Sequence, residues 1–229
     1  MTEKPKTLKT EDTGKTLEMA ICLAYGIPYD GEDFKYSMEK AEVLSKRLSQ
    51  LLVLFDTPTH TAKKGARYDF TNTNGEHLSA KTSKKTSVCM VAPQVIGQAA
   101  PKKFCDIIGI EYVDVPTLKH FLQDNVALIL EQMCNYTFDC PNLHYIEQSG
   151  VIRYITLETP IDWSQYSYIW TQNADSWKNS STLKINCDGK FIALAEFQFH
   201  GKSRTNMANR WNYKNFLLMF SKNLRIIVL

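Results

Sequence analysis

Two amphipathic helices are predicted at the start of the chain. Residues 14–25 place apolar side chains on one face, with Thr13 as the helix cap and Gly26-Ile27-Pro28 as the stop. A second, longer helix is predicted over about residues 32–55. Its apolar side chains fall at spacings of three and four, which is the period of a helix face: Phe34, Met38, Ala41, Leu44, Leu48 and Leu51.

The pattern then changes to that of short strands. Residues 56–65 read as a loop, and strands are predicted at about 67–71 and 77–83. The Asn74-Gly75 pair between them is a strong signal for a tight hairpin turn. A further β-like segment is predicted at about 87–91.

The rest of the chain alternates again. Helices are predicted from Pro101 and over about 116–136, and strands follow at about 151–157, 166–171, 182–186, 190–200 and 224–229. Helices, a hairpin, more helices and more strands predict an α/β fold with a central mixed β-sheet flanked by helices. No linker divides the chain, so a single domain over residues 1–229 is expected.

Composition favours a globular protein. Hydrophobic residues make up 44% of the chain and charged residues 22%, and no apolar run approaches the roughly 20 residues that cross a bilayer. The polar start, Met1 to Lys15, has no secretion signal, so we expect a cytoplasmic protein without a membrane partner. In that compartment the six cysteines are expected as free thiols, and the Cys134/Cys140/His144 spacing is wider than usual zinc sites.

Positive charge is concentrated in two segments of a nearly neutral chain. The net charge is +3, but no acidic residue follows Glu196, and a second basic stretch runs over residues 63–85 and includes Lys84 and Lys85. Such segments fit a protein that grips a polyanion, although a solvated surface would explain either segment alone.

The hairpin carries the candidate chemistry. Strand side chains alternate, so Ser79 and Lys81 share one side, and a tight turn brings Asp69 opposite them with the Ala80 carbonyl alongside. A carboxylate and a carbonyl are ligands for Mg²⁺, which stabilises charge on a phosphate and activates water. A nearby lysine can orient or deprotonate that water.

This hairpin resembles the PD-(D/E)xK motif of type II restriction endonucleases. The Ser- and Lys-rich stretch after the lysine strand, residues 82–88, is similar to the same region of MspI-like enzymes. The resemblance implies Mg²⁺ at Asp69 and the Ala80 carbonyl, with Lys81 as the catalytic lysine and Ser79 in the place of the motif's second acid. It also implies that Glu18 resembles the extra helix-borne carboxylate of many such enzymes.

The motif has two departures. Arg67-Tyr68 precedes Asp69 where the motif has proline, and Ser79 is a poor metal ligand. Glu18 or Glu76 is then needed to supply the missing charge. The alternative interpretation is a surface hairpin with a solvated ion pair. The lone histidines, such as His60, His120 and His144, are interpreted as structural.

A polar stretch near the end of the chain is expected to read DNA. Residues 196–212 are rich in Gln, His, Lys, Arg and Asn, the side chains that pair with base edges and phosphates. We expect a strand-and-loop arm over about 196–215, similar to the recognition arms of small restriction enzymes. Its DNA contacts are predicted at Arg204, Asn206, Asn209 and Arg210, then Gln198 and His200, with Lys202 nearby. The alternative is a polar loop, and the aromatic residues Phe197, Phe199, Trp211 and Phe216 are expected in the core.

The expected function is therefore a type II restriction endonuclease that cleaves double-stranded DNA at a short sequence, with its catalytic core at about residues 12–95. The alternatives are a repair or structure-specific nuclease on the same core, and a DNA-binding protein without catalysis, which Ser79 favours. A homodimer suits a palindromic target. Small enzymes of this kind also act as single subunits.

The predicted arm makes a test of base reading possible. Arg204→Ala and Asn206→Ala should each reduce the preference for the cognate site over a one-base variant by about 1–3 kcal/mol, because each removes a base-edge contact. Competition binding with paired duplexes measures this preference. Equal losses on cognate and altered sites would contradict base reading and indicate phosphate contacts.

Overall fold

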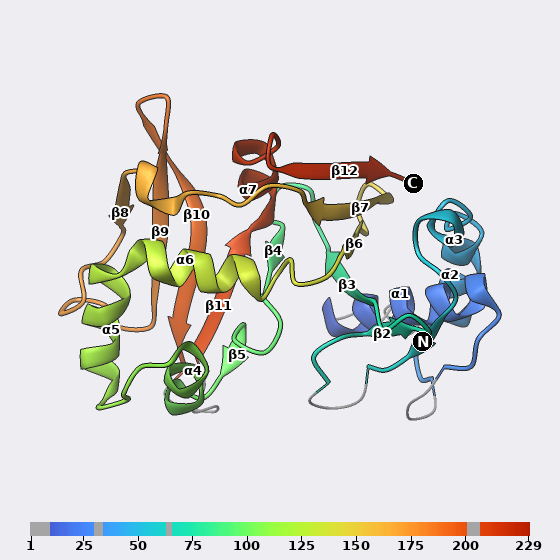
Figure 1. Cartoon of the computed structure of the whole chain (residues 1–229), viewed down its shortest axis with the longest axis horizontal. Helices are drawn as coiled ribbons and strands as arrows, with labels where there is room; N and C mark the ends of the chain where they lie inside the picture. The colour runs from blue at the N-terminus through green and yellow to red at the C-terminus, as the bar shows by residue number, and fades with distance from the viewer. Residues whose placement is uncertain (1–9, 30–33, 63–65, 201–206) are drawn as a thin grey trace, which may run out of the picture. The chain divides into compact units, whose positions relative to one another are not determined.

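The computed structural model describes residues 10–29, 34–62, 66–200 and 207–229. The chain forms two compact units, each with its own six-stranded sheet (Figure 1). Unit 1 comprises Met1–Ser87, Cys140–Thr156 and Ile226–Leu229, and unit 2 comprises Val88–Asp139 and Leu157–Arg225. The expected α/β class, with a mixed sheet accompanied by helices, is confirmed.

The sheet of unit 1 has the order β1-β2-β3-β6-β7-β12. Its strands are β1 (Pro58–His60), β2 (Phe70–Asn72), β3 (His77–Ser83), β6 (Asn142–Ile146), β7 (Val151–Leu157) and β12 (Leu224–Val228). The first three strands are joined antiparallel, whereas β6 runs parallel to β3. The predicted strand 77–83 and the Asn74-Gly75 turn are confirmed, and Gly75 has the positive φ of 77° that such a turn requires.

The first helix of unit 1, α1 (Thr10–Tyr25), starts earlier than predicted and ends at Gly26 as predicted. Thr13 is therefore inside the helix, and its hydroxyl donates to the Glu147 carboxylate at 3.1 Å instead of capping.

The single helix predicted over residues 32–55 is wrong. The structure has α2 (Met38–Ser45) and α3 (Leu51–Leu54), separated by a turn. Ser37 caps α2 through the Lys40 amide, and Leu48 in the turn is fully buried. Both Leu48 and Leu51 keep the helical apolar spacing, but the backbone hydrogen bonds there shorten to three-residue turns.

One face of the unit 1 sheet forms the core with α1. Phe70 and Leu78 are fully buried against Leu17 and Ile21, and Ala80 packs on the same cluster. Because strand side chains alternate, the residues between these positions on β3 point to the other face. The apolar face thus fixes which side the polar residues of the hairpin occupy.

The sheet of unit 2 has the order β4-β11-β10-β9-β8, and β5 also pairs with β11. Its strands are β4 (Met90–Val91), β5 (Gln98–Ala99), β8 (Tyr168–Trp170), β9 (Ser180–Cys187), β10 (Lys190–Phe199) and β11 (Met207–Asn212). Its helices are α4 (Pro101–Ile108), α5 (Val115–Asp124), α6 (Val126–Asn135), α7 (Tyr213–Met219) and the 3₁₀ turn η1 (Trp163–Gln165). The helix predicted over 116–136 is interrupted at Asn125, whose φ of −120° and ψ of 40° are not helical.

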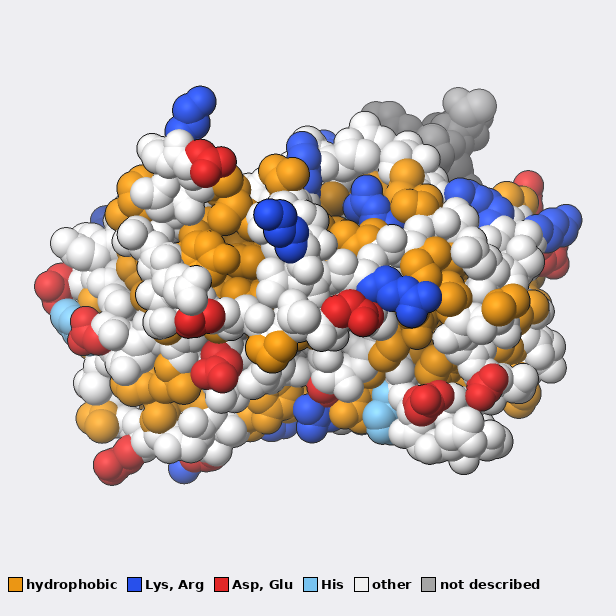
Figure 2. Space-filling view, turned by 45° about the horizontal axis from the view of Figure 1, so that its top comes forward, with side chains coloured by type: hydrophobic (Ala, Val, Ile, Leu, Met, Phe, Trp, Pro, Cys, Tyr) orange, Lys and Arg blue, Asp and Glu red, His pale blue; other side chains and the backbone are white. Residues whose placement is uncertain are grey.

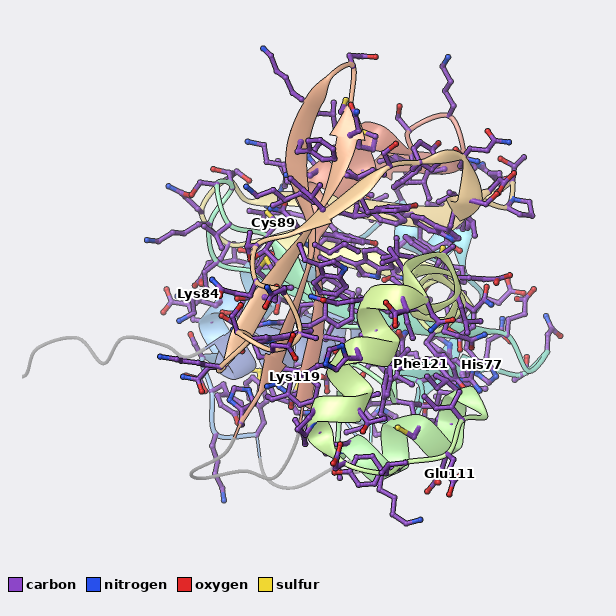
Figure 3. The ribbon with its side chains drawn as sticks, turned by 90° about the vertical axis from the view of Figure 1, so that its left-hand side faces the viewer. His77, Lys84, Cys89, Glu111, Lys119 and Phe121 are labelled. Atoms are coloured by element: carbon purple, nitrogen blue, oxygen red, sulfur yellow. The ribbon has the colours of Figure 1, made fainter. Side chains whose placement is uncertain are left out.

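Aromatic residues build the core of unit 2. Phe197, Trp211 and Phe216 are fully buried and Phe199 is 8% exposed, which confirms the prediction that they pack in the core. Lys119 of α5, labelled in Figure 3, donates to the Trp177 carbonyl and lies 5.5 Å from the Phe199 ring centre. Burial lowers the pKa of this lysine.

The described part of the chain holds no helix that is both long and apolar enough to cross a membrane.

The shared core of α1 and the hairpin predicts a large effect of Phe70. Phe70→Ala should lower the free energy of unfolding by about 3–5 kcal/mol, because it leaves a cavity in a closed apolar cluster. Val53→Ala is the control, since Val53 is 86% exposed and should change stability by no more than about 0.5 kcal/mol. Urea unfolding measures both, and equal small effects would contradict the core assignment.

Candidate active site

Asp69 lies just before β2, opposite Ser79 of β3. The strand pairing aligns Phe70 with Leu78, so the next pair toward Asp69 places it beside Ser79. Oδ2 of Asp69 accepts a hydrogen bond from the Ser79 hydroxyl at 3.0 Å and another from the Ala80 amide at 2.7 Å. Phe70 and Leu78 face the core, so Asp69, Ser79 and Lys81 share the other face, as the strand alternation predicts.

The Ala80 carbonyl lies on the Asp69 side of β3. The Ser79 amide donates toward β6, to the Pro141 carbonyl at 3.0 Å. The Ala80 amide points the opposite way and donates to Asp69. Within a strand, the N–H and C=O of one residue point to the same edge, so the Ala80 carbonyl also faces the Asp69 edge. An oxygen donor and the carboxylate therefore lie together.

The environment of Asp69 disfavours its charge. Burial is the largest cause that raises the pKa of this half-buried carboxyl, and the nearby Glu18 charge raises it further. The Lys81 ammonium and the hydrogen bonds from Ala80 and Ser79 lower the pKa, but the net shift is upward. Lys81 thus acts electrostatically on Asp69, as expected of a lysine on the same face.

Glu18 comes from α1, which packs on the Phe70 and Leu78 face of the hairpin, and its charge acts on Asp69. Its side chain is 9% exposed. Oε2 accepts from the Lys15 ammonium at 2.8 Å and lies 3.1 Å from Nε2 of His60 on β1. His60, for which no partner was predicted, therefore contacts the acid that acts on Asp69. Because His60 is 42 positions from Glu18, no local pattern signals this contact.

Glu76 is not the acid that acts on Asp69. It is exposed in the hairpin turn, where its carboxylate accepts from the Asn72 side chain at 2.6 Å and its carbonyl accepts from the Asn72 amide. It stabilises the turn. Of the two acids considered from the sequence, Glu18 is the one whose charge raises the pKa of Asp69.

The donor set fits a hard divalent cation. Among the described residues no group of three or more His, Cys, Asp or Glu side chains is gathered as a metal site. Asp69, Glu18 and the Ala80 carbonyl offer oxygen, the donor type that Mg²⁺ takes, and Mg²⁺ commonly keeps several waters and uses only one or two carboxylates. Burial and the Glu18 charge raise the pKa of Asp69, and a bound cation would favour its ionised form.

Two residues of the predicted DNA-reading arm are held by an acid on the same sheet face. Arg210 of β11 and Gln198 of β10 both donate to Glu196, each at 2.9 Å. Both are partly exposed, and His200 is exposed at the end of β10. These bonds to Glu196 restrict the orientation of the Arg210 and Gln198 side chains.

The predicted base contact of Asn209 does not agree with the structure. Asn209 was expected to contact bases, but it is fully buried, because the strand pairing places it opposite Phe197 on the core face. Its side-chain amide donates to the Ile96 carbonyl at 3.0 Å. Residues 207–212 were expected as part of a loop and instead form β11. Lys202, Arg204 and Asn206 lie outside the described residues.

Lys84 and Lys85 directly follow β3. Lys84, labelled in Figure 3, is partly buried, and Lys85 is exposed. The Lys84 carbonyl accepts from the backbone amide of Gln148 at 3.0 Å. On the face drawn in Figure 2, acidic side chains lie among the Lys and Arg side chains. Lys84 and Lys85 add positive charge next to the hairpin.

Comparison with known proteins gives one informative similarity. The chain is 39% identical, over 97% of its length, to the type II restriction enzyme CviAII of Paramecium bursaria Chlorella virus 1. It spans 64% of the length of that relative. No protein-family model matches the sequence. No solved structure matches it either.

The unfavourable charge of Asp69 predicts a pH-dependent gain in stability on its removal. Asp69→Asn keeps an oxygen for Ser79 and Ala80 but carries no charge, so without divalent metal it should raise the free energy of unfolding at pH 7 by about 1 kcal/mol. Because the folded pKa is raised, the favourable contribution of wild-type Asp69 is fully present below its ordinary value of 3.8 and is lost as pH rises through the folded pKa.

The advantage of Asp69→Asn should therefore vanish as the pH falls below about 4, where an aspartate is protonated in both states. Urea unfolding between pH 3 and 8 measures it. Asp106→Asn is the matched control, since the Asp106 side chain is 60% exposed. A loss of stability at pH 7 in Asp69→Asn would contradict the electrostatic description of the site.

Proposed function

We propose that this chain is a type II restriction endonuclease, which hydrolyses phosphodiester bonds of double-stranded DNA at a short specific sequence and uses Mg²⁺. The observation that carries the proposal is the hairpin site. There the Asp69 carboxylate is bonded to β3 beside the Ala80 carbonyl, and the Lys81 charge acts on it. The similarity to a type II restriction enzyme over 97% of the chain supports the same activity.

Each residue of the site has a separate role in the proposed reaction. Asp69, the Ala80 carbonyl and Glu18 hold the cation. When bound, Mg²⁺ supplies charge stabilisation at the phosphate and a more acidic water. Lys81 orients the attacking water, takes its proton or neutralises charge that develops on the phosphate. Ser79 holds Asp69 in place through its hydroxyl, with no metal contact of its own.

The finer assignment is to the PD-(D/E)xK superfamily, near the MspI-like enzymes. Two observations support it: the acid and the lysine lie on one face of neighbouring strands, and the helix-borne Glu18 acts on the same acid. Ser79 occupies the position of the motif's second acid but has a different role. It is 1% exposed and donates a hydrogen bond to Asp69, where the motif's acid would share the metal.

Sequence reading is assigned to the arm at about 196–215 of unit 2. Arg210, Gln198 and His200 remain as described candidates, and Lys202, Arg204 and Asn206 as candidates outside the described residues. Lys84 and Lys85 are assigned to phosphate contacts next to the hairpin. A homodimer on a palindromic site and a single subunit per cut are both compatible with these assignments.

Digestion of plasmid DNA tests the function and separates it from its rivals. The purified protein with Mg²⁺ should yield discrete bands that map to one short sequence. A smear would indicate a nuclease without sequence reading, such as a repair or structure-specific enzyme. Intact plasmid together with sequence-specific binding would indicate a DNA-binding protein without catalysis. Either of these results contradicts the proposal.

Lys81→Ala should reduce the single-turnover cleavage rate by at least about 100-fold, the lower range for loss of a general acid–base group. Binding to the cognate duplex in Ca²⁺ should stay within a few-fold, because Lys81 acts on the reaction. Lys190→Ala, an exposed lysine at the start of β10, is the matched control and should cleave at the wild-type rate. Wild-type cleavage by Lys81→Ala would overturn the assignment of the site.

A further inference from the structure

Glu18 is a buried acid that contacts two side chains, His60 and Lys15. Only His60 is buried with it. His60 is 1% exposed and Glu18 is 7% exposed. The Lys15 side chain, one turn earlier on α1, is 31% exposed. The two partners contact the same oxygen, Oε2, from different directions. Their different exposure suggests different roles.

The His60 ring is fixed by packing. It stacks on Tyr29 with ring centres 4.5 Å apart and lies 5.0 Å from the ring centre of Phe70. A ring held between two aromatic side chains has little freedom to turn. Nε2 of His60 lies 3.1 Å from Oε2 of Glu18, and a carboxylate oxygen accepts a hydrogen bond from the ring tautomer that carries its hydrogen on Nε2.

The strand that carries His60 also lies against Asp69. Thr61, the next residue, donates its amide to the Asp69 carbonyl at 2.9 Å. His60 itself is aligned with Phe70, the residue after Asp69. Residues 60 and 61 thus connect the two acids, because His60 contacts the Glu18 carboxylate and Thr61 donates to the Asp69 carbonyl.

We propose that His60 is a positioning residue that holds the Glu18 carboxylate for the metal, and that Lys15 is the cation that the metal replaces. The proposal rests on the metal site of the proposed function. His60 acts through Glu18 and touches neither the DNA nor the cation. Lys15 neutralises Glu18 in the metal-free protein and swings toward solvent when a divalent ion takes its place.

Such outer partners of ligands commonly change metal affinity by 10–100-fold when they are removed. His60→Phe keeps an aromatic ring between Tyr29 and Phe70 but has no donor, so it should weaken Mn²⁺ binding at least about 10-fold. His60→Gln restores an N–H in a similar place and should recover most of that loss. Lys15→Met should strengthen Mn²⁺ binding by about two- to fivefold, the range expected for removal of a partly exposed competing ion pair.

Electron paramagnetic resonance of free Mn²⁺ measures these affinities in the full chain without DNA, and circular dichroism with thermal unfolding checks that each variant is folded. His120→Phe and Lys102→Met are the matched controls, because both residues form ion pairs on helices of unit 2 and should leave Mn²⁺ binding unchanged. In cleavage assays, raised Mg²⁺ should restore the rate of His60→Phe but not that of Lys81→Ala.

The outcomes separate the inference from the proposed function. If Glu18→Gln weakens Mn²⁺ binding while folded His60→Phe binds like wild type, the positioning role of His60 is overturned and the metal site stands. If Lys15→Met binds no more tightly than wild type, the exchange of Lys15 for the metal is overturned. If Glu18→Gln and Asp69→Asn both bind Mn²⁺ like wild type, the metal site itself is wrong, and the inference falls with it.

Discussion

The pair of hydrogen bonds that Asp69 accepts from Ser79 and Ala80 is the interaction on which the site depends. The main chain of Asp69 is held by the Thr61 amide, which donates to its carbonyl, and these two bonds fix its carboxylate against β3. They place the carboxylate beside a carbonyl and on the face of Lys81. Without them an acid at the start of a three-residue strand would be free to turn into solvent, and the hairpin would carry an isolated lysine.

The same arrangement disfavours the negative charge of the Asp69 carboxylate. Burial and the Glu18 charge disfavour the ionised form of Asp69, and the Lys81 charge offsets them only in part. The apolar cluster of Leu17, Phe70 and Leu78 stabilises the unit enough to hold these groups together. Strain of this kind is common at sites where a protein binds a cation or performs chemistry, because stability is traded for function.

Local patterns in the sequence were sufficient for the hairpin and for the face that Ser79 and Lys81 share. The spacing of two strands around an Asn-Gly turn fixes both, so no distant contact was needed. Glu18 was suggested by resemblance, and its charge does act on Asp69. His60 could not be found in this way, because its contact with Glu18 depends on β1 pairing with β2 under α1.

The wrong prediction for Asn209 and the missed strand β6 share one physical cause. In both, pairing with another strand determines a structure that local composition does not predict. Asn209 lies in an amide-rich segment that reads as a loop, yet pairing with β10 turns it into the core. β6 has no strong strand pattern of its own, yet it completes the sheet as the parallel neighbour of β3. In both cases the neighbouring strand, distant in sequence for β6, determines the structure and the exposed face.

The central claim is that Asp69, the Ala80 carbonyl and Glu18 hold one divalent ion. Anomalous diffraction from crystals soaked in Mn²⁺ tests it most directly. The account predicts a single strong peak in contact with an Asp69 oxygen and the Ala80 carbonyl, with Glu18 reached directly or through water and Lys15 displaced. Wild-type crystals with no peak at Asp69, while Lys15 remains bonded to Glu18 at saturating Mn²⁺, would contradict it.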